Sequence, residues 1–342
     1  MQPIRHDQLL RDLLRSDEPS IRWKVRTGVL GQSRLDPEVA RLEQAIRRSP
    51  RVRALLSHQQ APFRAGTARS VYYKWQGIHW VLTSLADLGY PRGDPALKPL
   101  IDRALGLWLR PGFLRTSAVS TRAEALRHQG VPVVRGRARR CASQQGNALR
   151  YVTTLCWPDE RCAQLVDLLL RWQWPDGGWN CDMRPEADSS SFMESLTPMR
   201  ALAAYAKESR DSRAGQAAER ASEIFLRRRM YLRKSDGKVM DPGFLKLHYP
   251  LYWHYDVLGG LKGIAEVGRI RDVRCSAALD WLEERELPAG GWPADARFYR
   301  VSKSFRSSSE FMGWGITGRR SRNEWVTTDA LQVLKEAGRL AL

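Results

Sequence analysis

Long apolar runs, paired cysteines and acidic residues are all scarce in this chain of 342 residues. No stretch approaches the roughly 18 apolar residues that a membrane-spanning helix needs. The first 30 residues are charged throughout and hold no apolar signal core, so we expect a cytoplasmic protein. The five cysteines are odd in number and form no CxxC pair, which argues against a disulfide framework and a small zinc fold.

Acidic residues are outnumbered by basic ones, 37 to 56, and the net charge is +19. A charge of this size attracts polyanions and anionic substrates. The arginines are spread along the chain and accompany no recognition motif, so nucleic-acid binding is the least favoured interpretation. We expect a small-molecule substrate, mainly apolar, that carries an anionic or polar group. The sequence does not indicate an oligomeric state.

Alternation of apolar and polar residues, the mark of a strand, is also nearly absent. Apolar residues instead recur at helical spacing. The N-terminal helical pair spans about 5–31, and longer amphipathic segments follow at 37–48, 96–109, 160–172, 213–229 and 273–286. Together these segments predict an all-α protein of about six helical hairpins in a single domain, 1–342.

Tryptophan is abundant, with 13 residues, and two copies accompany a repeated turn. The segments 171–179 and 283–292 each contain the end of a helix, then Pro and Gly-Gly, then Trp. Other helices end in an apolar turn followed by Gly89, Gly268 or Gly338, where a left-handed C-cap is expected. These patterns predict a structure built from helical repeats.

The first of these turns, with Gln173, Asp176, Gly177, Gly178 and Trp179, resembles the QW repeat of squalene–hopene cyclases and oxidosqualene cyclases. The resemblance implies an α/α toroid, that is, helical hairpins closed into a ring. We expect the Gln side chain to bond backbone at the start of the next helix. We expect the glycines to adopt positive φ and the Trp to clamp an outer helix to an inner one. The second copy lacks the Gln and the Asp.

The same stretch is similar to the β subunit of protein prenyltransferases, whose zinc ligands are an Asp, a Cys and a His. The matching positions here are Asp188, Ser190 and His254. Ser is a poor zinc ligand compared with a thiolate, so zinc at Asp188 and His254 is only weakly implied, and no other cofactor is expected. The chain contains neither the DxDD motif of squalene cyclases nor the DDxxD and NSE motifs of class I terpene synthases. Standard cationic cyclisation with either trigger is therefore not supported.

Polar residues at the starts of inner helices would line the mouth of a toroid, and we take them as site candidates. Carboxylates and a neutral imidazole can exchange protons with a substrate near neutral pH. An Asp before a helix is also a common N-cap, so Asp188 has a structural alternative. The catalytic candidates are Asp188, Glu194, His254, Asp256 and Glu324.

Aromatic residues recur at the same helix starts, where their rings could hold an apolar chain or stabilise a cation. The substrate-binding candidates are Tyr73, Trp75, Tyr252, Trp253, Tyr255 and Trp325. The long connection at about 293–322 is a candidate lid, and its Arg300 could meet an anionic group of the substrate.

Three functions remain open at this point. The first is an enzyme of the squalene cyclase or prenyltransferase kind that performs acid–base cyclisation, isomerisation or prenyl transfer on a prenyl-like or polycyclic molecule. The second is a non-catalytic toroid that binds a lipid or small molecule. The third is a carbohydrate-active α/α-barrel, a lyase or hydrolase of an anionic substrate, which requires two suitably spaced carboxylates.

Overall fold

The computed structural model describes residues 3–57 and 71–340, and most of the ordered elements in them are helices. The main helices are α1 (Pro3–Leu14), α2 (Pro19–Lys24), α3 (Pro37–Arg47), α4 (Pro50–Ser57), α6 (Ile78–Leu88), α7 (Lys98–Trp108), α8 (Pro111–Leu114), α9 (Arg122–Arg127), α10 (Ala142–Leu155), α11 (Glu160–Trp172), α12 (Phe192–Ser209), α13 (Ser212–Leu226), α14 (Val257–Glu266), α15 (Ser276–Glu284) and α16 (Glu324–Glu336). A π-helical turn, η1 (Val25–Val29), continues α2. Short 3₁₀ turns occupy η2 (Pro95–Leu97), η3 (Pro242–Leu245) and η4 (Val273–Cys275).

The described strands are short and lie in two small sheets. β1 (Thr116–Ala118) pairs in parallel with β2 (Val131–Val134), which pairs in the antiparallel sense with β3 (Arg137–Ala138). β4 (Arg300–Val301) pairs in parallel with β5 (Ser309–Glu310). These strands are too short to show alternation in the sequence, and the prediction of a mainly helical protein is confirmed.

Aspartates begin many of the helices. At the starts of α3, α11, α13 and α14, an Asp side chain accepts a hydrogen bond from a backbone N–H two or three residues further on. Each such bond satisfies a donor that has no partner inside the helix, which typically contributes about 1 kcal/mol. The capping residues are Asp36, Asp159, Asp211 and Asp256. At the other end of α6, Gly89 adopts φ +79° in the left-handed region, as predicted.

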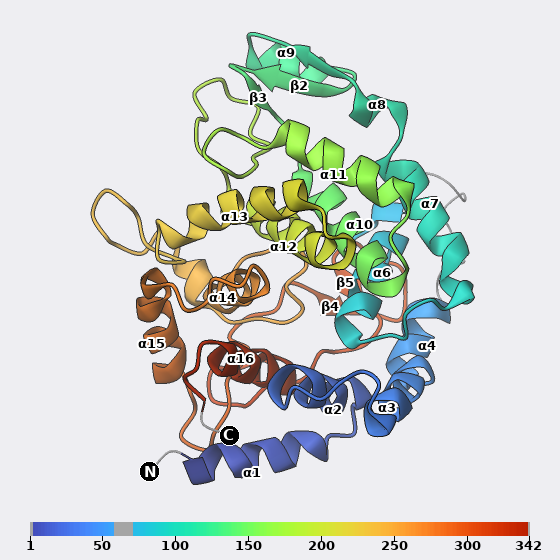
Figure 1. Ribbon diagram of the computed structural model, residues 1–342, viewed down its shortest axis with the longest axis vertical. Coiled ribbons are helices and arrows are strands. Elements are labelled where there is room, and N and C mark those ends of the chain that lie inside the picture. The colour runs from blue at the N-terminus through green and yellow to red at the C-terminus, as the bar shows by residue number, and fades with distance from the viewer. Residues whose placement is uncertain (1–2, 58–70, 341–342) are drawn as a thin grey trace. The chain divides into compact units, whose positions relative to one another are not determined.

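The chain divides into two compact units. Unit 2 comprises Arg92–Arg228 and Trp253–Tyr255, and its centre is the packing of α10 to α13, drawn from green to yellow in Figure 1. The contact of α10 with α12 is close because Gly146 lies against Pro198. A Cβ at position 146 would lie 2.7 Å from the backbone N and Cα of Pro198. Any larger residue at 146 would force these two helices apart.

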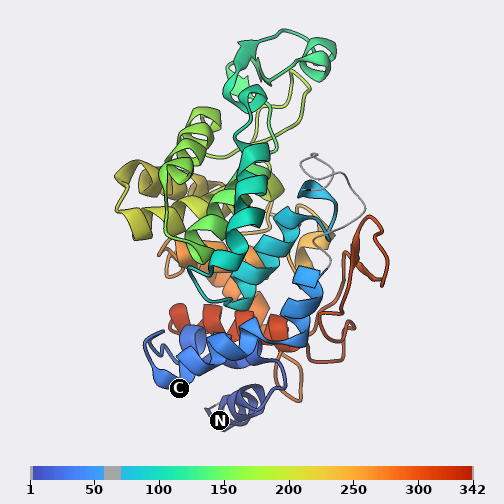
Figure 2. The same cartoon turned by 90° about the vertical axis from the view of Figure 1, so that its right-hand side faces the viewer.

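Unit 1 comprises Met1–Pro91, Arg229–Tyr252 and Asp256–Leu342. Its α2 and η1, near the N-terminus, pack against the C-terminal α16, which Figure 1 and Figure 2 both show as blue ribbon next to red, and α1 packs against α2 and η1. Polar contacts join the same segments: the hydroxyl of Ser16 donates to Glu324, and Lys24 donates to Asp329. Segments from both ends of the sequence thus form one core.

The Gly-Gly-Trp turns form the same contacts in both units. Trp179 donates its indole N–H to the carbonyl of Leu169 in α11 at 2.9 Å, and Trp292 donates to Leu282 in α15 at 2.7 Å. Each Trp also donates its backbone N–H to a hydroxyl on the following helix, Ser195 of α12 or Thr327 of α16. The predicted clamp between two helices is therefore present twice.

The role predicted for Gln173 was wrong in its detail. Its side-chain amide donates to the carbonyls of Gly177 and Ala217 and does not cap the next helix. The amide therefore links the turn to α13, because Gly177 belongs to the turn and Ala217 belongs to α13.

The sequence placed several of the helices correctly. The segments predicted at 37–48, 160–172 and 273–286 correspond to α3, α11 and η4 with α15, and the N-terminal pair corresponds to α1 and α2 with η1. In the part of the chain that the structure describes, no helix is both long and apolar enough to cross a bilayer. The closure of the helices into a ring and the single-domain organisation stay predictions.

Candidate functional site

Three of the predicted catalytic residues lie in unit 2. Asp188 is exposed and accepts a hydrogen bond from Ser189, while Ser191 takes the N-cap position of α12, so Asp188 is not the cap. Glu194 lies in the first turn of α12 and accepts a hydrogen bond from the backbone N–H of Ser143. The half-buried ring of His254 stacks on Trp253, with ring centroids 4.1 Å apart.

The other two predicted catalytic residues lie in unit 1, where both have structural partners. Asp256 is buried, caps α14 through the N–H of Gly259, and lies 2.9 Å from the Nδ1 of buried His248. The backbone N–H of His248 donates to the same carboxylate. Glu324 accepts a hydrogen bond from Ser16 at 2.8 Å. Asp256 thus holds the start of α14 and the His248 segment together.

The structure brings some of the predicted substrate-binding aromatics together and separates others. Trp75 and Tyr252 stack with centroids 3.9 Å apart and planes 6° from parallel, and Trp325 stacks on Tyr249. Tyr255, in unit 2, packs against Phe192 and Phe225. Tyr73 is half-buried, and Arg300 is an exposed residue of β4.

Glu310 is the acidic residue that the sequence analysis missed. It lies on β5, is 1% exposed, and accepts a hydrogen bond from the hydroxyl of Tyr252 at 2.5 Å. Backbone hydrogen bonds fix its strand, because Trp75 donates to the carbonyl of Ser309 and Ser308 donates to that of Lys74. Burial raises the pKa of the Glu310 carboxyl from 4.5 to about 7, and Tyr252 and Arg51 only partly oppose this. The group is therefore poised to hold and release a proton at neutral pH.

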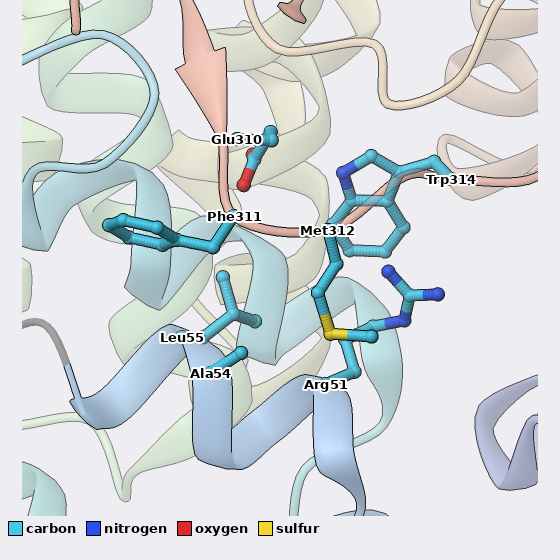
Figure 3. Close-up of a pocket in the computed structure, with 7 residues that line it drawn as sticks. All are labelled: Arg51, Ala54, Leu55, Glu310, Phe311, Met312 and Trp314. Atoms are coloured by element: carbon cyan, nitrogen blue, oxygen red, sulfur yellow. The ribbon is translucent and has the colours of Figure 1, made fainter. Parts of the chain in front are cut away.

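A narrow pocket adjoins Glu310 (Figure 3). On one side lie residues of α4, and on the other lies the segment that follows β5. The space amounts to about 170 Å³ and no part of it admits a water molecule. The lining residues are Arg51, Ala54, Leu55, Glu310, Phe311, Met312 and Trp314. The dry, mostly apolar lining explains why the carboxyl resists ionisation.

The guanidinium of Arg51 reaches this pocket but is already paired. It donates to Glu18 at 2.8 Å and to the carbonyl of Gly313, and it lies over the ring of Trp314 at 4.3 Å. Its charge is therefore balanced within unit 1.

A second group of charges in unit 1, buried or half-buried, is balanced as well. Lys24 donates to Asp87 at 2.9 Å and to Asp329 at 3.4 Å, and Lys262 donates to Asp329 at 2.7 Å. Burial lowers the pKa of Lys24, but Asp329 and Asp87 outweigh it, so the pKa is raised. The hydroxyl of Tyr249 donates to Asp87. Two cations facing two carboxylates form a neutral network, which is a structural arrangement.

Unit 2 holds a cluster of two thiols and a carboxylate. The ligand atoms of Cys141, Cys181 and Glu194 all lie within 4.8 Å of one another, and all three residues are half-buried. The hydrogen bond to Cys141 and burial raise the pKa of the Cys181 thiol, and burial raises that of the Glu194 carboxyl. Among the described residues, this group of potential metal ligands does not include Asp188 or His254, the pair implied by the prenyltransferase resemblance.

No protein-family model matches this chain, and a search of curated proteins also finds no match. The function proposed below therefore depends on the residues of the site and their surroundings alone.

One signal in the sequence points to Glu310. It is the single acidic residue between Asp295 and Glu324, in a segment rich in arginine and lysine, and Phe311 and Met312 follow it directly. An isolated carboxyl beside apolar residues is costly to bury unless it is paired or functional. For the cysteines there was no such signal, because 39 residues separate Cys141 from Cys181.

Proposed function

We propose that this protein is an enzyme that binds a mainly apolar small molecule beside Glu310 and transfers a proton to it. The observation that carries the proposal is the position of Glu310, a buried carboxyl that faces an apolar pocket and accepts a hydrogen bond from Tyr252. A carboxylic acid that stays protonated near pH 7 is an effective general acid.

The substrate class that fits this acid is an alkene. Tyr252 donates to Oε1, so the acidic proton belongs on Oε2. As this O–H bond breaks, a C–H bond forms at one alkene carbon and leaves a carbocation on the other. The Glu310 carboxylate then removes a proton from an adjacent carbon, which restores the acid and gives an isomerised alkene. Capture of the cation by a second double bond of the same molecule before this step gives a cyclised product.

The pocket must open for a substrate to enter, since it does not admit water as it stands. Met312 is the lining side chain that adapts most readily, because its unbranched thioether has several rotatable bonds. The movement of a lid formed by 293–322, which carries β4, β5 and Glu310, is part of this proposal. Prenyl transfer is not part of it, because Arg51 is already paired with Glu18 and does not present a free cation for a diphosphate.

An α/α toroid related to terpenoid cyclases remains part of the proposal. It is supported by the two equivalent clamps of Trp179 and Trp292, each of which joins two consecutive helices in the way that the QW-repeat resemblance implied. A cytoplasmic location stays a prediction.

The test is proton transfer in deuterated water. Purified protein is incubated with a panel of prenyl alkenes and polyprenyl alcohols, and the recovered molecules are analysed by mass spectrometry for deuterium. We expect deuterium uptake by wild-type protein and a loss of about 10²–10⁴-fold in Glu310→Gln. Glu336→Gln, a change in α16 outside the pocket, is the control and should retain the activity. The rate should fall as pH rises above about 7, where Glu310 loses its proton.

Equal deuterium uptake by wild type and Glu310→Gln would refute the role of Glu310. A lipid that co-purifies with the protein and is never converted would favour the second function, a binding protein without catalysis.

A further inference from the structure

Three segments of unit 2 bring Cys141, Cys181 and Glu194 to one place. Cys141 occupies the N-cap position of α10, Cys181 lies in the loop after Trp179, and Glu194 lies in the first turn of α12. The thiol of Cys181 and Oε1 of Glu194 are 3.5 Å apart. The acid–base chemistry proposed for Glu310 makes no use of this cluster.

Hydrogen bonds join the three segments and orient the Glu194 side chain. Arg139 and Asn180, which precede the two cysteines, pair as a parallel β-bridge. The Asn180 side chain donates to the carbonyl of Ser189, and the backbone N–H of Ser143 donates to Oε2 of Glu194 at 3.1 Å. The carboxylate is thus oriented by one oxygen while the other faces Cys181. Such support is what holds the ligands of a metal site in position.

The charges around the cluster suit a divalent cation. Two thiolates and a carboxylate would carry three negative charges in a half-buried space, and Zn²⁺ would reduce this to one. The neighbouring guanidinium of Arg140, which interacts electrostatically with Cys141, Cys181 and Glu194, compensates that remaining charge. Thiolates favour zinc and exclude calcium and magnesium, which take oxygen ligands.

The distances agree with tetrahedral geometry. With Zn–S near 2.3 Å and Zn–O near 2.1 Å, a sulfur and an oxygen on one zinc ion are about 3.6 Å apart. The 3.5 Å between Cys181 and Glu194 matches this edge. The three ligand atoms lie within 4.8 Å of one another, so the other edges would shorten by at most about 1.2 Å to surround one ion.

We infer that Cys141, Cys181 and Glu194 bind one zinc ion, whose fourth position is open to water or to a small anionic or thiol ligand. Three protein ligands and one exchangeable position are typical of catalytic zinc sites, whereas structural sites are closed by four protein ligands. This ligand set differs from the Asp188 and His254 pair that the prenyltransferase resemblance implied.

The test measures metal content and cobalt spectra of the full chain, purified under reducing conditions without chelator. We expect one zinc per chain by elemental analysis. After replacement of zinc by Co²⁺, we expect a thiolate-to-cobalt charge-transfer band. Cys181→Ser should reduce this band by about half, because one of two thiolates is lost. Loss of a hydrogen bond that merely supports a metal ligand costs roughly 10–100-fold in affinity. Loss of the Cys181 ligand itself should lower the zinc affinity by more than this.

Two further variants complete the test. Glu194→Gln keeps both thiolates, so it should retain the band but bind zinc more weakly. Cys156→Ser changes a half-buried cysteine outside the cluster and should behave as wild type. The inference is overturned if folded wild-type protein binds no zinc and gives no thiolate band with Co²⁺. It is also overturned if the Cys141→Ser/Cys181→Ser double variant retains the band, or if freshly purified protein is two hydrogens lighter because Cys141 and Cys181 form a disulfide.

Discussion

The protonation of Glu310 can be measured without knowledge of the substrate, through the stability of the Glu310→Gln variant at different pH values. In the folded chain the pKa is raised from 4.5 to about 7. Below about pH 4.5 the carboxyl is protonated in the folded and unfolded states alike. Between that value and about pH 7 the unfolded chain has lost the proton and the folded chain has kept it, so stability falls as pH rises.

The size of the effect follows from the pKa difference. A pKa difference of about 2.5, at about 1.4 kcal/mol per unit, gives a total loss of about 3 kcal/mol above pH 7. Glutamine has nearly the shape of the protonated acid and does not titrate. The free energy of unfolding of wild type relative to Glu310→Gln should therefore fall by about 2–3 kcal/mol between about pH 5 and about pH 8.

The assay is urea-dependent hydrogen exchange, read from peptides of α16 so that unit 1 is followed separately. The difference between the two proteins cancels the titration of groups that they share. Tyr252→Phe supplies a second test, since the Tyr252 hydrogen bond lowers the pKa of Glu310 in the folded chain. Its loss should move the upper end of the transition to higher pH, while the lower end, set by the unfolded chain, stays in place. A stability difference that stays constant from acid to alkaline pH would show that Glu310 does not keep its proton at neutral pH.

Three further predictions concern stability. Lys24→Met leaves Asp87 and Asp329 with one cation and should destabilise unit 1 by about 3–5 kcal/mol in urea unfolding. Adding Asp329→Asn should recover part of this loss, and no recovery would contradict the proposed charge balance. Trp292→Phe removes the hydrogen bond to α15 and should cost about 1–3 kcal/mol by the same measurement; an unchanged midpoint would refute the clamp. Gly291→Ala should cost more than Gly136→Ala in thermal unfolding. Both positions have positive φ, but a Cβ at 291 would come within 2.6 Å of another side chain and at 136 it would meet nothing; equal costs would contradict this.

The helices were predictable because their signals are local. Amphipathic spacing marked α3, α11 and α13, and Asp residues capped their starts. Gly89 ended α6 with the positive φ that glycine tolerates. The Gly-Gly-Trp turns were also visible in the sequence, since each clamp joins helices that are consecutive in the chain.

The candidate sites were harder to predict because they depend on contacts between distant segments. Glu310 meets Tyr252, 58 residues earlier, only because β5 pairs with β4 and hydrogen-bonds to residues 74 and 75. Cys141 meets Cys181 through the bridge of Arg139 with Asn180. No local pattern encodes these pairings.

Asp256 has a structural role that its place in the sequence did not indicate. Its carboxylate binds His248 and the start of α14, since His248 is brought back by the intervening loop. A role of Asp256 in catalysis stays a prediction.

The interleaving of unit 1 has a consequence for biosynthesis. Unit 2 is nearly continuous in the sequence, so its helices can pack as they emerge from the ribosome. Lys24, by contrast, meets Asp329 only after 305 further residues have been translated. At about 5–20 residues per second this takes roughly 15–60 s, during which α1, α2 and α6 expose apolar faces to solvent and to chaperones.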